Sequence, residues 1–284
     1  MYNFKKETSV YLVRGSDKYK LEVYADLSAS QTFDEGDHEV RTLHTPLDYH
    51  KRATVTKANP GNFSFTSPLK LEQADKPYSV LLDLALSYAS GTLENVDLYV
   101  VSSNVTYILQ KSVFENVTFN LTMGSVISVS VSGTFSRLEK FTSPIPGTLV
   151  VSDSSEYTAI RKLLIQIGNT SLSSIAGINI DVSNDISWRE NRSLHTLGSI
   201  VYPENYVLSG RRISGSITQF LTSDNVDVLS DTSTTSDLEI AIYTDLSDTE
   251  PFLAFLLPQI VYTRRISLDE IVNRVYDFRL TSNA

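Results

Sequence analysis

The histidines are the most distinctive of the residues that can carry chemistry in this chain. The 284-residue sequence has four histidines, and two of them lie in near-identical pentapeptides, RTLHT from residue 41 and RSLHT from residue 192. An arginine can bond a carboxylate through two parallel contacts, which suits it to an acidic neighbour. We therefore expect these loops to contact a neighbouring chain, the alternative being a loop that its charges merely keep soluble. The candidate contact residues are Arg41, His44, Arg192 and His195.

The other reactive side chains do not form a recognisable reaction site. His44 and His50 lie near Asp37 and Asp48, yet we expect His44 to serve a repeated turn or a subunit contact rather than a metal ion. The absence of cysteine excludes disulfides, thiolate zinc sites and cysteine nucleophiles. The run SGRRISGS at 209–216 lacks the pattern of a phosphate loop, and no Gly-x-Ser-x-Gly elbow occurs. We expect no catalytic residue, no metal, no cofactor and no enzyme activity.

Composition predicts a soluble, mainly β protein. The chain has 15 Tyr and 12 Phe beside many Val, Ile, Thr and Ser residues, which suit the half-buried surface of a sheet. The net charge is −9 and no basic run exceeds two residues, which argues against a protein that grips nucleic acid through phosphates. The start MYNFKKETSV has no apolar core and no long apolar run follows, so we expect synthesis in a cytoplasm without membrane contact.

The order of expected elements repeats in the two halves of the chain. Each half has β-rich segments before its pentapeptide, then a strand, a helical segment and further strands. The paired segments are strands at 62–69 and 213–223, helices at 79–89 and 223–231, and strands at 96–102 and 238–244, 107–121 and 252–268, and 125–138 and 270–281. The expected join is 142–155, which is rich in Pro, Gly and Ser. We predict two tandem β-sandwich or barrel modules, 1–143 and 144–284, each with a short flanking α-helix.

One long segment carries a resemblance to a known family. The run GINIDVSNDISWRENRSLHTLGSIVYPENYVLSGRRISGSITQFLTSDNVDVL at 177–229 resembles the tail tube proteins of long-tailed bacteriophages, in which an alternating strand leads through a long loop to a Ser-Gly-Ser strand and a helix. The first half, with KANPGNFSFTSPL at 57–69, resembles the same module less sharply. A duplicated tube fold is similar to the tube proteins of tequintavirus-type siphophages. The two modules leave no room for the immunoglobulin-like domain of the main tube subunits, so the likeness is greatest to the baseplate, or distal, tube protein.

The resemblance implies a structural protein of the virion tail. It implies a homotrimer with pseudo-sixfold symmetry whose stacked rings enclose a channel through which DNA passes without specific binding. We expect an acidic channel wall, because a wall without cations does not bind phosphates. The implied partners are further copies of the chain and other tail tube, tape-measure and baseplate hub proteins. The alternative is a receptor- or carbohydrate-binding β-sandwich of a tail tip or fibre.

Overall fold

The computed structural model describes most of the chain. The described residues are 8–24, 26–42, 45–70, 72–73, 75–87, 92–102, 105–153, 157–189, 200–223, 225, 235–268 and 272–281, with only the backbone described for 35–42 and 45–56. Strands dominate this part of the chain, so the predicted mainly β class is confirmed.

The strands follow one another along the chain with a single helix among the described residues. The strands up to residue 143 are β1 (Ser9–Arg14), β2 (Asp17–Leu21), β3 (Ser28–Ser30), β4 (Phe33–Thr42), β5 (Thr45–Ala58), β6 (Gly61–Pro68), β7 (Val96–Ser102), β8 (Val105–Thr122), β9 (Ser128–Phe135) and β10 (Arg137–Phe141). The later strands are β11 (Thr148–Val150), β12 (Lys162–Ile167), β13 (Thr170–Leu172), β14 (Ile175–Arg189), β15 (Asn205–Phe220), β16 (Ser236–Tyr243), β17 (Leu253–Leu268) and β18 (Val272–Leu280).

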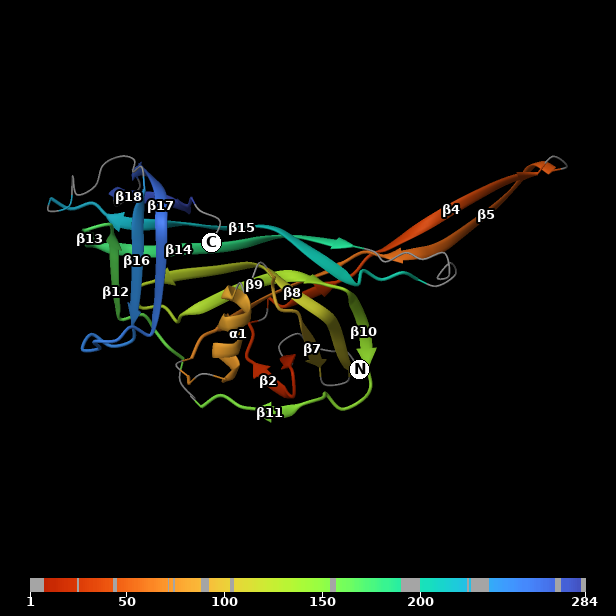
Figure 1. The fold of residues 1–284 in the computed structure, drawn as a ribbon, viewed down its shortest axis with the longest axis horizontal. Helices are drawn as coiled ribbons and strands as arrows, with labels where there is room; N and C mark the ends of the chain where they lie inside the picture. The colour runs from red at the N-terminus through yellow and green to blue at the C-terminus, as the bar shows by residue number, and fades with distance from the viewer. Residues whose placement is uncertain are drawn as a thin grey trace.

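The strands on either side of residue 143 pair in the same order. The earlier strands pair as β2-β1-β7-β8-β9-β6-β3, and the later strands as β13-β12-β16-β17-β18-β15-β14, with every neighbour antiparallel. A further antiparallel pairing of β8 with β14 joins both groups into one 16-stranded sheet. The hairpin of β4 and β5 forms a separate two-stranded sheet that projects far from the rest of the molecule (Figure 1).

The core lies on one face of this sheet because apolar and polar residues alternate along the strands. In β8, Val117, Phe119 and Leu121 are fully buried, while Asn116 and Asn120, at the alternate positions, are exposed. Successive side chains of a strand point to opposite faces, so this alternation sends every second residue into the core. The same alternation in β14 buries Ile178 and Ile180.

The helix α1 (Pro77–Leu86) packs its apolar side chains into the same core. Leu81 and Leu84 are buried, and Pro77 stands at the first turn, where its missing N–H costs no hydrogen bond. The helix predicted at 79–89 is therefore present, two residues earlier at its start. The second predicted helix, at 223–231, lies outside the described residues except for Ser223 and Asn225.

The predicted join at 142–155 is more ordered than a simple loop. Its residues Thr148–Val150 form β11, which lies parallel to β2, and the amide of Thr148 donates to the carbonyl of Ser16 at 2.9 Å. Gly147 turns the chain there with φ of 91°, a conformation that favours glycine. Further on, Ile160 is 1% exposed and its amide donates to the carbonyl of Ser125. The connection between the two groups of strands therefore lies against the first group.

A glycine faces a phenylalanine across neighbouring strands in both groups. Phe63 of β6 stands opposite Gly133 of β9, whereas Gly215 of β15 stands opposite Phe278 of β18. A Cβ added to Gly133 would overlap the carbonyl oxygen of Val113 and lie 2.9 Å from the Phe63 ring. A Cβ on Gly215 would lie 2.6 Å from Cζ of Phe278. Each glycine therefore provides the space that the opposite aromatic ring fills.

Substituting either glycine tests this packing. Gly133→Ala and Gly215→Ala should each lower the free energy of unfolding by about 1–3 kcal/mol, since the added methyl group overpacks a region next to fixed backbone. Ser216→Ala, on the neighbouring position of β15, is the matched control and should change it by less than about 0.5 kcal/mol. Chemical denaturation of the purified subunit measures all three. A Gly133→Ala variant as stable as the Ser216→Ala control would contradict the packing argument.

Candidate functional site

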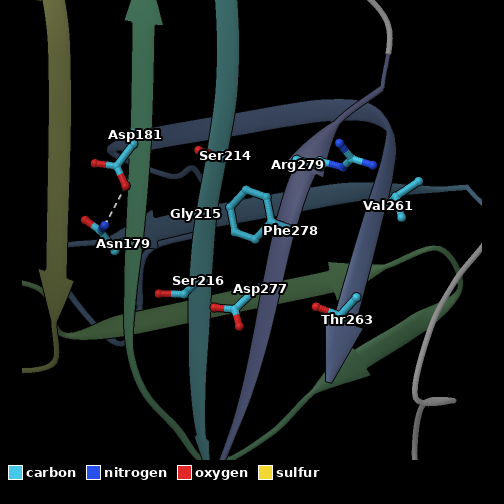
Figure 2. Close-up of a pocket in the computed structure, with 10 residues that line it drawn as sticks. All are labelled: Asn179, Asp181, Ser214, Gly215, Ser216, Val261, Thr263, Asp277, Phe278 and Arg279. Carbon is cyan, nitrogen blue, oxygen red and sulfur yellow. Dashed lines mark hydrogen bonds between the residues drawn. The ribbon is translucent and has the colours of Figure 1, made fainter. Parts of the chain in front are cut away.

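The face of the sheet opposite the core is polar, and it is the candidate functional surface. In the second group it is formed by β14, β15, β18 and β17, which lie side by side with a shallow hollow of about 500 Å³ (Figure 2). The hollow is lined by Asn179, Asp181, Ser214, Gly215, Ser216, Val261, Thr263, Asp277, Phe278 and Arg279. Most of these side chains are short and end in a hydroxyl, amide or carboxylate.

Hydrogen bonds within this face pair most of its charges. Asp181 accepts from Nδ2 of Asn179 at 2.7 Å and from the hydroxyl of Thr118 in β8, also at 2.7 Å. Nε of Arg265 donates to Asp277 at 2.8 Å. Ion pairs this exposed contribute little stability. They matter here because a paired carboxylate and guanidinium cancel each other's charge at the surface.

The same face of the first group is almost entirely hydroxyl and amide. The hydroxyls of Ser28 and Ser64 lie 2.8 Å apart, and those of Thr66 and Ser130 lie 2.9 Å apart. Asn116 donates to the hydroxyl of Ser132 at 3.4 Å. The result is a row of neutral hydrogen-bonding groups that crosses β3, β6, β9 and β8.

A hydrogen-bond network fastens the hairpin of β14 and β15 onto the first group. Nε1 of Trp188 donates to the hydroxyl of Thr134 at 2.8 Å, and that hydroxyl donates to Glu115 at 2.6 Å. Burial raises the pKa of Glu115, and the hydrogen bond from Thr134 acts in the opposite direction. On the same hairpin, Arg211 donates to the carbonyl of Leu86 at 2.8 Å. Trp188 is therefore only partly buried and has a polar partner.

The two pentapeptides belong to the ends of two long hairpins. Arg41 lies in β4, next to the two-residue connection to β5, so it is part of a strand rather than of the predicted loop. His44 in that connection lies outside the described residues, as do Arg192 and His195 in the segment between β14 and β15. The predicted contacts of these four residues therefore remain predictions.

Sequence reasoning did not identify the polar face, although its pattern is visible in the letters. The run SVSVSGT at 128–134 alternates serine with valine, and SGSIT at 214–218 places hydroxyl residues at every second position. Such alternation predicts a strand with one polar face. What it does not predict is which other strands lie beside it.

The described residues hold no arrangement suited to a reaction at this surface. Among them, no group of three or more His, Asp or Glu side chains is placed to hold a metal ion. The surface instead offers many hydroxyl and amide groups, with its acidic and basic side chains close to one another. Such a surface binds water and attracts a polyanion only weakly, because it gives phosphates few cations that lack a carboxylate partner.

Comparison with protein-family models identifies the family of this chain. No helix in the described part of the chain is long and apolar enough to cross a membrane. A search of curated proteins finds no match. A family model described as "Bacteriophage Baseplate Tube Protein Family" matches residues 1–284, which is the whole sequence. The chain therefore belongs to the bacteriophage baseplate tube protein family, a family of structural proteins of the phage tail.

Proposed function

We propose that this chain forms a ring of the baseplate tube as a homotrimer, in which residues 1–143 and 144–284 are two copies of one module. The observation that carries the proposal is the shared strand order of the two groups. If each module occupies one sixth of a ring, three chains give pseudo-sixfold symmetry. The pairing of β8 with β14 is then a contact between modules that occurs within one chain.

A local irregularity at the same place in both groups supports the duplication. Lys111 in β8 has φ of 53° and Gln259 in β17 has φ of 54°, values that residues other than glycine rarely adopt. The amide of Lys111 donates to Asp97 at 3.0 Å, and the amide of Gln259 donates to Asp237 at 3.0 Å. Two modules of independent origin would have no reason to share this detail.

The spacing of equivalent strands also supports the duplication. Ala29 of β3 stands opposite Phe63, and Ile180 of β14 stands opposite Gly215, at the same point of the glycine and phenylalanine pairs described above. Ala29 and Ile180 are 151 residues apart, as are the two pentapeptides. The proposal therefore treats RTLHT and RSLHT as equivalent ends of two hairpins that contact a neighbouring subunit or ring.

The polar face is the proposed wall of the DNA channel, with a charge that differs from the acidic wall expected from the sequence. On β14, β15, β17 and β18 the acidic side chains of this face are Asp181, Asp185 and Asp277, and the basic ones are Arg212, Arg265 and Arg279. Arg212 pairs with Asp185 at 2.9 Å. We propose a wall of balanced charge dominated by hydroxyl and amide groups. Such a wall still lets DNA pass, because each phosphate meets few available cations.

The first test of this proposal is the number of chains in a ring. Rings released from tails should have a mass of about 95 kDa, three times the 31.6 kDa of one chain. Two modules per chain let three chains close the ring. Mass photometry or native mass spectrometry measures this directly. A particle of six chains per ring would contradict the duplication.

The second test changes the two pentapeptides together. Arg41→Ala with Arg192→Ala should leave the subunit folded and reduce tail assembly, because the two arginines are proposed to meet acidic groups of a neighbour. Lys20→Ala, which removes an exposed cation from β2, is the matched control. Negative-stain counts of complete tails and thermal melting of the subunit give the two readouts. Normal tail numbers for the double variant would exclude these contacts.

The third test adds charge to the proposed channel wall. Ser130→Lys with Ser216→Lys should slow DNA ejection and make its rate more dependent on salt, since new cations bind phosphates. Ser130→Glu with Ser216→Glu changes the same positions with the opposite charge and should not slow ejection. The ejection rate is followed by dye uptake on released DNA. Equal rates for the lysine and glutamate variants would place this face away from the DNA.

A further inference from the structure

The contact between the two groups is made along one edge of β8. The strand β7 pairs with β8 as far as Ser112, and β14 then pairs with β8 from Asn116 to Thr122. In this second stretch, Phe119 stands opposite Ile180, and both side chains are buried. The ring of Phe119 also meets the ring of Phe255 in β17, with centroids 5.2 Å apart. The first group thus contributes a strand edge and an aromatic side chain to the second.

The strand β17 corresponds to β8, except that β8 has one extra residue at a bulge between Phe114 and Asn116. The irregular residues Lys111 and Gln259 fix the correspondence of the N-terminal parts, so that Tyr107 corresponds to Phe255. Beyond this point, Phe119 pairs with Val129 in β9 and Ile266 pairs with Arg274 in β18 at the corresponding position. Ile266 of β17 is therefore the counterpart of Phe119.

The counterparts of the buried contact residues are exposed. Ile266 and Leu268 are 56% and 80% exposed, whereas Phe119 and Leu121 are fully buried. The strand β16 pairs with β17 only as far as Ile260, and none of the described strands continues along that edge as β14 does along β8. Large apolar side chains at such an exposed strand edge favour pairing with another strand.

The matching acceptor is the open edge of β3. The strand β3 occupies the position that β14 has in the second group, and it pairs with β6 alone among the described strands. Its residues Ser28, Ala29 and Ser30 are exposed. Tyr107, the counterpart of Phe255, is 41% exposed. The molecule therefore presents counterparts of both halves of the β8 and β14 contact, at two separate strand edges.

We propose that the C-terminal part of β17 pairs antiparallel with β3 of a second copy of this chain, with Ile266 opposite Ala29 and packed against Tyr107 of that copy. The register repeats the one in which Phe119 stands opposite Ile180 within a chain. This proposal rests on the trimeric ring proposed above and specifies the contact that closes it. A head-to-tail contact of this kind closes a ring when the rotation between neighbours fits, and it covers the open edges of β17 and β3.

The charges near this contact are compatible with it. In the same register Arg265 stands opposite Ser30, on the polar face of both strands. Arg265 keeps its bond to Asp277 of its own chain at 2.8 Å, so closure buries no isolated charge. The corresponding pair within the chain is Thr118 opposite Asp181, where the hydroxyl of Thr118 donates to the carboxylate of Asp181 across the contact.

A cross-link tests the register, and the natural lack of cysteine makes the experiment clean. Ala29→Cys with Ile266→Cys should form a disulfide between chains in assembled tails, because directly opposite side chains of antiparallel strands have Cβ atoms about 4.5–5.5 Å apart. A bond within one chain is not expected, since β3 and β17 lie at separate places in the strand order with five strands between β6 and β17. Ala29→Cys with Arg265→Cys is the control, because its two side chains lie on opposite faces.

The expected result is a ladder of dimers and trimers on a non-reducing gel that collapses to monomer on reduction. Absence of the ladder in tails with three chains per ring would overturn the register and leave the ring proposal standing. Six chains per ring would overturn the ring proposal itself. A cross-link from either cysteine to a different tail protein would also overturn the assignment of a second copy as the partner.

A charge at the contact provides a second measurement that does not depend on disulfide geometry. Ile266→Asp should leave the thermal unfolding of the subunit unchanged, because this side chain is largely exposed, and should reduce ring formation at least tenfold. Leu256→Asp is the matched control, since Leu256 is a 71% exposed residue of the same strand outside the proposed contact. Equal ring formation by the two variants would overturn the proposal.

Discussion

The constraint on which this structure depends is the pairing of strand edges. An antiparallel strand exposes unpaired N–H and C=O groups along any edge that has no neighbour, and such an edge attracts another strand. Within the chain, β14 covers the edge of β8 beyond Ser112, and the contact buries Phe119 and Ile180. The shared strand order of the two groups means that the same requirement arises again at β17. Ring formation is the simplest way to satisfy it.

The alternation of side chains separates the two faces of the sheet, so that one face packs the core and the other forms the polar surface. The inward residues of β8, β9 and β14 form the core, so stability depends on them and on the glycine and phenylalanine pairs. The outward residues are free to be hydroxyl, amide or paired charges. The proposed channel wall requires a face that binds water and attracts DNA only weakly, and these outward residues provide it.

Much of the fold could be predicted because its evidence is local. The segment VDLYVVS predicted a strand at 96–102, which is β7, and the helix formers at 79–89 predicted α1 to within a few residues. The pairing of β8 with β14 could not be predicted. It joins residues far apart in sequence, and neither segment has a residue pattern that identifies the other as its partner. Neither Lys111 nor Gln259 has a side chain that predicts a positive φ. The polar face was not identified from its alternating serines, and the pentapeptides indicated equivalent loops but not their partners.

A density map of the assembled tail, at a resolution that separates strands, tests the pairing of β17 with β3 most directly. A hydrogen-bonded ladder should run from β17 of each chain into β3 of the next, in the register that joins β8 to β14 within a chain. Six similar contacts around each ring would then alternate between those within a chain and those between chains. A map in which the edges of β17 and β3 face solvent, or pair with a different protein, would contradict it.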